Sequence, residues 1–169
     1  KKYGEIKKMK AAFAFEAPKK NWWRLDKKYA GGGPLMDLGI YCLQGIIYTT
    51  GMLPIAVTAQ SPPVSNKEIF IDVEETLTWQ MEMPNGAIAE CRTSYSGEYQ
   101  NILRADAEKG WFELSPAFSY DGIKSSNSDG KELNFSKFSQ QAKQMDGIAV
   151  SIKNNQKSIT IVMLFLLTL

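Results

Sequence analysis

The stretch VEETLTWQMEMPNGAIAECRTSY, residues 73–95, decides the fold class. Up to Met83 it places mostly apolar side chains at odd positions and polar ones at even positions, which is the period of a strand with one buried and one wet face. Pro84-Asn85-Gly86 follows, and an Asn-Gly pair between two such runs is typical of a tight hairpin. The run Ala87 to Tyr95 is therefore expected to return antiparallel beside the first strand.

Elements on both sides of this hairpin complete the pattern. Met9, Ala11, Phe13 and Phe15 alternate as in a strand, residues 18–33 read as an irregular loop, and residues 35–50, between Pro34 and Gly51, have the spacing of a buried helix. A second amphipathic helix is expected over residues 136–154. Shorter strands are expected at Ile55–Gln60, Gln100–Asp106, Trp111–Leu114 and Phe118–Ile123. Strand, helix, many antiparallel strands and helix together predict an α+β domain.

The composition removes several classes of function. The chain has 169 residues, of which 44% are hydrophobic and 22% charged, as is typical of a globular protein. Histidine is absent, so catalytic triads and zinc sites that need imidazole are excluded. The two cysteines, Cys42 and Cys91, cannot form a four-thiolate site alone, and we expect no metal. Two thiols in a chain of this size are typical of a reduced, cytoplasmic protein.

The charge is small in sum and uneven in distribution. A formal net charge of +2 argues against binding nucleic acid. The first 28 residues carry ten basic and three acidic side chains, which could mark an anionic partner and are more typical of a solvated face. The acidic residues Glu68, Asp72, Glu74 and Glu75 could bind a hard cation, but strand alternation puts the last two on opposite faces and favours a solvated loop edge.

Three features near the first helix could carry chemistry. Gly31-Gly32-Gly33 could bind phosphate, but no strand directly precedes it and no Lys-Ser/Thr follows, which favours a tight loop-to-helix turn. Asp37 and Tyr41 share a helix face and could offer two protic groups to one substrate; alternatively, Asp37 supports the helix start and Tyr41 is a core aromatic. Arg24 beside Trp23 could bind a phosphate or carboxylate, or anchor the loop.

Two runs carry a resemblance to a known family. Asn21-Trp22-Trp23-Arg24-Leu25-Asp26 and Ala30-Gly31-Gly32-Gly33-Pro34-Leu35-Met36-Asp37-Leu38-Gly39-Ile40-Tyr41 resemble the C-terminal domain of the glucose-fructose oxidoreductase family, written Gfo/Idh/MocA. The specific string is G-G-G-x-L-x-D-x-G-x-Y/H, and its final tyrosine resembles the glucose-fructose oxidoreductase branch. The resemblance covers residues from about 4 to 157.

The resemblance implies an NAD(P)-dependent enzyme whose N-terminal Rossmann domain, outside this sequence, binds NAD or NADP. It implies a large, open, mostly antiparallel sheet with flanking helices, similar to the C-terminal domain of glyceraldehyde-3-phosphate dehydrogenase. By this resemblance Asp37 positions the substrate, Tyr41 is the acid or base, and Trp23 with Arg24 reaches the nicotinamide end of the cofactor. The implied substrate contacts are Arg24, Asp37, Tyr41 and Tyr95. The family's Glu-Lys-Pro motif does not occur here.

The expected function is therefore that of the substrate-binding and dimerisation domain of an oxidoreductase that acts on a sugar or polyol. The domain is expected to be inactive alone and to form a homo-oligomer through its sheet. The alternative is a non-catalytic assembly module with a vestigial pocket, and a membrane-surface module is disfavoured because no amphipathic helix joins the basic start to the apolar end. That end, residues 159–169, is shorter than the ~20 residues of a membrane span. We expect one domain, residues 1–157, and an atypical hydrophobic tail, residues 158–169.

Overall fold

The computed structural model describes residues 2–18, 22–120, 122–132 and 139–156. The chain divides into two compact units. The first comprises residues 1–119 and 123–133, and the second comprises residues 120–122 and 134–169. Each unit is described by itself below.

A seven-stranded sheet forms most of the first unit, with strand order β2-β3-β4-β1-β5-β6-β7. Neighbouring strands run antiparallel except β1 and β4, which are parallel. The expected α+β class and the open, mostly antiparallel sheet are thus confirmed. The strands are β1 Ile6–Ala14, β2 Ala56–Gln60, β3 Thr76–Glu82, β4 Ile88–Ser94, β5 Gln100–Ala107, β6 Gly110–Leu114 and β7 Ser125–Asn127.

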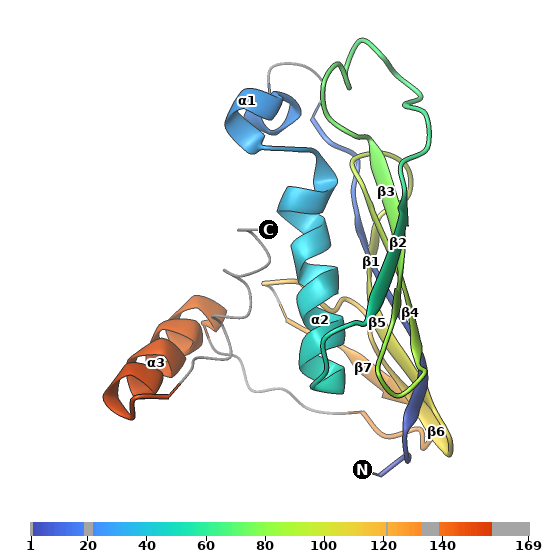
Figure 1. The fold of residues 1–169 in the computed structure, drawn as a ribbon, viewed down its shortest axis with the longest axis vertical. Helices are drawn as coiled ribbons and strands as arrows, with labels where there is room; N and C mark the ends of the chain where they lie inside the picture. Colours follow the sequence, from blue (N-terminus) through green and yellow to red (C-terminus); the bar gives the residue numbers. More distant parts are fainter. Residues whose placement is uncertain (1, 19–21, 121, 133–138, 157–169) are drawn as a thin grey trace. The chain divides into compact units, whose positions relative to one another are not determined.

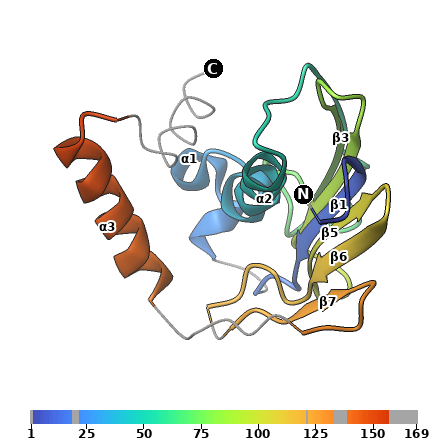
Figure 2. The same ribbon diagram turned by 90° about the horizontal axis from the view of Figure 1, so that it is seen from below.

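One face of this sheet is covered by the helix α2, Ile40–Thr50, as Figures 1 and 2 show. The covered face carries the odd-numbered positions of the central strands, so the predicted alternation holds. Cys42 and Ile46 of α2 are fully buried against them. They belong to one buried cluster with residues of the sheet that include Met9, Ala11, Trp79, Met81, Met83, Ala89, Cys91, Leu103 and Ala105.

The predicted helix over residues 35–50 is present, but it has two parts. Its first turn, Leu35–Gly39, is π-helical, and α2 continues from there. Gly51 ends it in the left-handed conformation (φ 70°) with its N–H bonded to the carbonyl of Ile47, as expected for a glycine stop. The expected irregular loop before it also differs, because it contains a 3₁₀ turn at Trp23–Leu25, labelled η1, and a short helix α1 at Lys27–Ala30.

The hairpin between β3 and β4 forms as predicted, with Gly86 at φ 79° in the turn. The predicted strand Phe118–Ile123 is wrong for the residues that the structure describes. The backbone N–H groups of Ala117 and Phe118 donate to the side-chain oxygen of Asn101, at 2.8 and 2.7 Å, so this segment is held by a side chain instead of a strand ladder. The next strand is β7.

The two cysteines are free and buried in the first unit, consistent with the reduced state expected for them. Burial raises the pKa of the Cys42 thiol to about 12, and burial followed by the proximity of Cys42 raises the pKa of Cys91. Both thiols are therefore protonated and unreactive near neutral pH.

The described part of the second unit contains the helix α3, Gln140–Lys153. The hydroxyl of Ser139 caps it by accepting from the N–H of Ala142 at 3.3 Å. The helix predicted over residues 136–154 is thus confirmed from Gln140 onward, while residues 136–138 and the tail from Ser158 lie outside the described residues. No helix in the described part of the chain is long and apolar enough to span a membrane.

Candidate functional site

The site is centred on Asp37 in the π-helical turn. Arg24 donates from Nε to Oδ1 of Asp37 at 3.0 Å, and the hydroxyl of Tyr95 donates to Oδ2 at 3.0 Å. Both carboxylate oxygens therefore have a partner. About a third of the Arg24 side chain and a quarter of the Asp37 side chain remain exposed (31% and 25%), so the cluster is open to a ligand.

Aromatic rings frame the Arg24 guanidinium. The guanidinium lies over the ring of Trp23 at 4.3 Å from its centroid and near that of Trp22 at 5.2 Å. Trp22 packs edge-on against Tyr95, with centroids 5.1 Å apart, whereas 52% of Trp23 is exposed. Trp22 is thus the loop anchor, and Trp23 presents a free indole surface beside a cation.

Tyr95 is a buried hydrogen-bond donor directly after β4. Burial raises the pKa of its hydroxyl, and the Asp37 carboxylate raises it further. The phenol therefore stays protonated and donates to Asp37 at neutral pH. Its backbone N–H donates to the carbonyl of Glu75 at 3.0 Å, and this hydrogen bond fixes the position of the Tyr95 backbone.

Tyr41 lies in different surroundings. Its ring is edge-on to Phe13, with centroids 5.7 Å apart, and tilted against Phe118 at 6.1 Å. The structure thus brings Trp23, Arg24, Asp37 and Tyr95 together in one cluster and places Tyr41 in an adjoining aromatic one.

The backbone N–H groups at the end of the glycine string already bind an anion of this chain, the carboxylate of Glu74. The Glu74 carboxylate accepts from the N–H of Gly33 at 2.8 Å and from that of Leu35 at 3.2 Å. A Cβ at Gly33 would lie 2.2 Å from the Glu74 carbonyl oxygen, so this close approach requires glycine. The tight-turn interpretation holds, and the phosphate interpretation is disfavoured because Glu74 occupies those donors.

The expectation of a solvated acidic edge is wrong for Glu75, which is 6% exposed. Its carboxylate accepts from the backbone N–H and the hydroxyl of Ser65. Burial alone would raise the pKa of Glu75, but hydrogen bonds from Ser96 and Ser65 outweigh it and lower that pKa. In the part of the chain that the structure describes, no three His, Cys, Asp or Glu side chains gather as a metal site.

Sequence reasoning missed these two glutamates as parts of the site. The strand predicted from Val73 begins only at Thr76, so Glu74 and Glu75 precede it. Their hydrogen-bond partners differ, lying about 40 residues upstream for Glu74 and in the loop at Ser65 for Glu75. The one sequence signal for Glu74 is Pro34, which has no side-chain acceptor for the free N–H groups at the helix start. Those N–H groups therefore need an acceptor from elsewhere in the chain.

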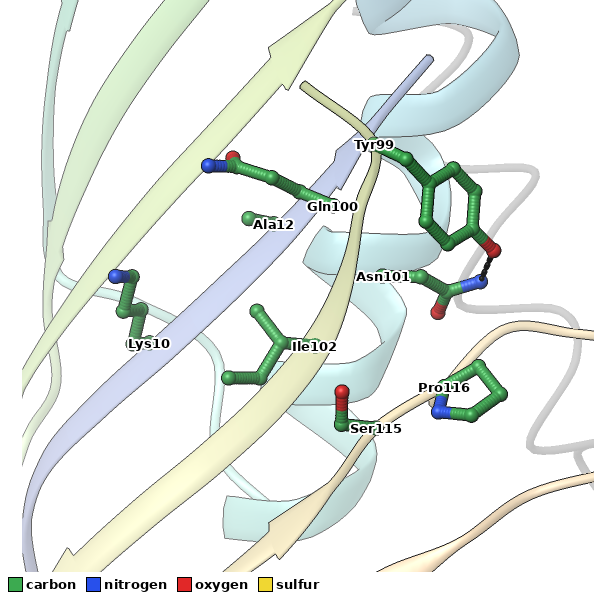
Figure 3. A pocket seen from close by; sticks show the side chains of 8 residues that line it. All are labelled: Lys10, Ala12, Tyr99, Gln100, Asn101, Ile102, Ser115 and Pro116. Carbon is green, nitrogen blue, oxygen red and sulfur yellow. Dashed lines mark hydrogen bonds between the residues drawn. The ribbon is translucent and has the colours of Figure 1, made fainter.

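The opposite face of the sheet carries a hollow of about 400 Å³, shown in Figure 3. It lies over β1 and β5, where Lys10, Ala12 and Gln100 point away from the covered face. The amide of Asn101 donates to the Tyr99 hydroxyl at 3.0 Å at its rim. Its lining consists of Lys10, Ala12, Tyr99, Gln100, Asn101, Ile102, Ser115 and Pro116, and so contains none of the site residues expected from the sequence.

An open mixed sheet with one helix-covered face defines the class as an α+β domain, and this domain carries a partly exposed charged cluster at the first turn of the covering helix. Residues 1–113 match the family model described as the GFO/IDH/MocA C-terminal domain. The chain belongs to this family, as its sequence motifs predict.

Named relatives fit this assignment. D-xylose 1-dehydrogenase [NADP(+)] of Haloarcula marismortui is 30% identical over 102 residues, which are 60% of this chain and 28% of that protein. The structure of aldose-aldose oxidoreductase from Caulobacter crescentus, complexed with glycerol, matches with a TM-score of 0.83 and 31% identity, over 93% of this chain and 48% of that one. The 3-ketoreductase KijD10 from Actinomadura kijaniata shares the fold, with a TM-score of 0.68 and 16% identity over 89% of this chain and 47% of its own. The chain thus spans about half or less of each relative's length.

Proposed function

We propose that this chain is the substrate-binding and dimerisation domain of an NAD(P)-dependent oxidoreductase that moves hydride to or from a sugar or a related polyol. The observation that carries the proposal is the Arg24–Asp37–Tyr95 cluster, built on the glycine string and π-helical turn. Two relatives at about 30% identity support the substrate class, since one is named for xylose and the other for aldoses. The domain boundary at residue 157 remains part of this proposal.

The proposed roles divide between the two clusters. Asp37 holds Arg24 and Tyr95 in place, and these three side chains orient the hydroxyl groups of the sugar. Tyr41 gives a proton to the substrate oxygen when a carbonyl is reduced, and takes it back when an alcohol is oxidised. A bound NAD or NADP would supply or accept the hydride at the carbon of the same group.

The residues present fit a partial role in holding the cofactor. The amides at the helix start are bonded to Glu74 and so do not hold a pyrophosphate. The exposed indole of Trp23 and the Arg24 guanidinium beside it remain as contacts for the nicotinamide end. Two such contacts imply that another domain binds most of the NAD or NADP.

Calorimetric titration of the 169-residue chain with NAD and with NADP tests this division. We expect no binding in the micromolar range, and micromolar affinity would contradict a cofactor site located mainly elsewhere. The activity itself is tested in the full-length protein by following the nicotinamide absorbance with a panel of aldoses. Absence of turnover with every aldose and polyol, with either cofactor, would favour the alternative of a non-catalytic assembly module.

We infer that the open face of the sheet is the dimer surface. Across it, Gln80, Glu90, Lys10, Arg104 and Glu113 lie in register on five neighbouring strands. Both signs of charge occur along this row, and two of its members form ion pairs with neighbours on the same face, Glu90 with Lys8 at 2.9 Å and Arg104 with Asp106 at 2.8 Å. A surface that interleaves both signs is complementary to a second copy of itself, and its polarity suits a wet interface.

Sedimentation of the chain with and without residues 158–169 tests this surface. A closed dimer that persists after removal of the tail is expected from association through the sheet. Ill-defined aggregates that disappear with the tail would instead assign association to its apolar residues. A monomer after removal of the tail would contradict the dimer proposal.

A further inference from the structure

We propose that Glu74 is a positioning residue, which fixes the distance between Asp37 and Tyr95 from outside the site; its catalytic importance rests on the function proposed above. Glu74 contacts neither side chain of that pair through a hydrogen bond in the described residues. It acts through the backbone that carries them.

Glu74 is linked to Asp37 through the backbone of the helix start. The Glu74 carboxylate accepts from the backbone N–H groups of Gly33 and Leu35, at 2.8 and 3.2 Å. These are donors of the first turn, which no side chain within the helix start satisfies, since Pro34 provides no side-chain cap. Hydrogen bonds to a charged acceptor are the stronger kind, so they fix the position of the turn that carries Asp37.

The next residue, Glu75, is linked to Tyr95 through the backbone. The carbonyl of Glu75 accepts from the backbone N–H of Tyr95 at 3.0 Å and from the Ser94 hydroxyl at 3.3 Å. The carboxylate of Glu75 is in turn held by Ser65. Residues 74 and 75 are thus tied to both parts of the site and are themselves anchored to the loop at Ser65.

The Tyr95–Asp37 hydrogen bond closes a ring of three chain segments, residues 33–37, 74–75 and 94–95. Each segment is bonded to the next, so the distance between the phenol and the carboxylate is determined by the ring. The glycine at position 33 gives the ring its tight approach, because the Glu74 backbone leaves no room for a Cβ there. Without the Glu74 carboxylate, the helix start loses this tie and Asp37 moves relative to Tyr95.

The test uses Glu74→Ala and Glu74→Gln in the 169-residue chain, with Asp72→Asn as the matched control. Asp72 lies in the same segment, and its carboxylate accepts from the backbone N–H of Lys27. Asp72→Asn therefore also removes one negative charge, but from a hydrogen bond outside the ring of segments. NMR measures amide hydrogen exchange at Gly33 and Leu35 and the chemical shift of the Tyr95 ring carbon that bears the hydroxyl. Asp37→Ala supplies the reference shift for a lost hydrogen bond.

In Glu74→Ala we expect exchange at both amides to accelerate about tenfold or more, since each loses a charge-assisted bond. The Tyr95 shift should move towards the Asp37→Ala reference. Glu74→Gln keeps one acceptor oxygen and should give intermediate values, and it also decides the question if the alanine variant fails to fold. Asp72→Asn should match the wild type in both readouts. An unchanged Tyr95 shift in a folded Glu74 variant overturns the proposal.

Steady-state kinetics of the full-length protein separate this inference from the function on which it rests. Glu74→Ala should lower kcat about tenfold with little change in the KM for the cofactor, because the site is misaligned while the cofactor contacts remain. If Asp37→Ala and Tyr95→Phe retain wild-type turnover, the proposed function fails while the NMR result still decides the role of Glu74. If those two variants lose turnover and Glu74→Ala does not, the positioning role fails alone.

Discussion

Asp37 and Tyr41 stand one helical turn apart, and their surroundings differ sharply. Asp37 lies among charged and protic groups, with Arg24 on one oxygen and the Tyr95 hydroxyl on the other. The ring of Tyr41 packs against the rings of Phe13 and Phe118, which also stack on each other. The polar cluster is held together by hydrogen bonds and partly open to water, whereas the aromatic cluster is held by packing.

This difference teaches that spacing on a helix assigns neighbours but not roles. The Asp37 carboxylate holds Arg24 and Tyr95 with its two oxygens, whereas the Tyr41 ring is placed by its contacts with other aromatic rings. The role proposed for Tyr41 depends on its hydroxyl. A substitution at Tyr41 should therefore change activity without changing stability, whereas a substitution at Asp37 should change both.

The largest effect is expected for Tyr41→Phe in the full-length protein. Removing the hydroxyl should lower kcat about 10²-fold or more, the scale of a general acid or base, while the ring keeps its contacts and the free energy of unfolding changes by less than about 1 kcal/mol. Steady-state kinetics and urea unfolding measure the two quantities. Tyr48→Phe, on an exposed position of the same helix, is the control and should change neither. Wild-type turnover in Tyr41→Phe would reduce Tyr41 to a core aromatic.

Asp37→Asn should give a smaller loss of turnover, about tenfold, together with a loss of stability. The asparagine side chain has one oxygen that accepts hydrogen bonds, so it can keep the bond from Arg24 or from Tyr95 but not both. The substitution also removes the ion pair between Asp37 and Arg24. The loss of stability should be about 1 kcal/mol, limited because both side chains are partly solvated. Asp106→Asn breaks the Arg104 pair on the open face and serves as control, with a similar stability loss and unchanged turnover. Equal turnover in Asp37→Asn and Asp106→Asn would contradict a specific role of Asp37 in turnover.

Glu75→Gln tests the anchor of the polar cluster through acid unfolding. The folded-state pKa of Glu75 is lowered, so its stabilising contribution is present above the ordinary glutamate pKa of about 4.3 and is lost as the pH falls through the folded value. We expect the variant to be about 1 kcal/mol less stable at neutral pH, with the difference shrinking in acid. Urea unfolding at several pH values measures this. Glu98→Gln, at an exposed position, should show no such pattern.

The smallest effect concerns Tyr95 at alkaline pH. Its folded-state pKa is raised by burial and by Asp37, so the contribution of the protonated phenol is complete below the ordinary tyrosine pKa of about 10 and is lost as the pH rises above it. Tyr95→Phe should therefore lose less stability than the wild type between neutral pH and pH values above about 10. Thermal unfolding across that range is the measurement, and a parallel decline in both proteins would contradict the assigned environment.

Local patterns predicted the elements of the fold well and their pairing less completely. The odd-even alternation around Trp79 and the Asn85-Gly86 turn fix one hairpin, because both signals lie within the residues that pair. No local pattern shows that β1 lies between β4 and β5, since these partners come late in the chain. The apolar residues around Phe118 predict a strand that does not form, because the acceptor that binds this segment, the side chain of Asn101, is distant in sequence.

The site could be predicted in its residue types and not in its contacts. The motif resemblance identifies Arg24, Asp37 and Tyr95, and the structure brings these three together. Which of them bond depends on the approach of β4 to the helix start, and that approach depends on Glu74 and Gly33. The acid or base role of Tyr41 stays a prediction until turnover is measured.

The place of β1 in the sheet also determines when the domain can fold. Its Met9 pairs with Ala89 on one side and with Ala105 on the other, so the earliest strand in the chain waits for two of the later ones. Contacts of such long sequence separation slow folding into the range of milliseconds to about seconds. During synthesis both backbone edges of β1 remain unpaired until β4 and β5 have left the ribosome, and unpaired strand edges expose the nascent chain to aggregation in that interval.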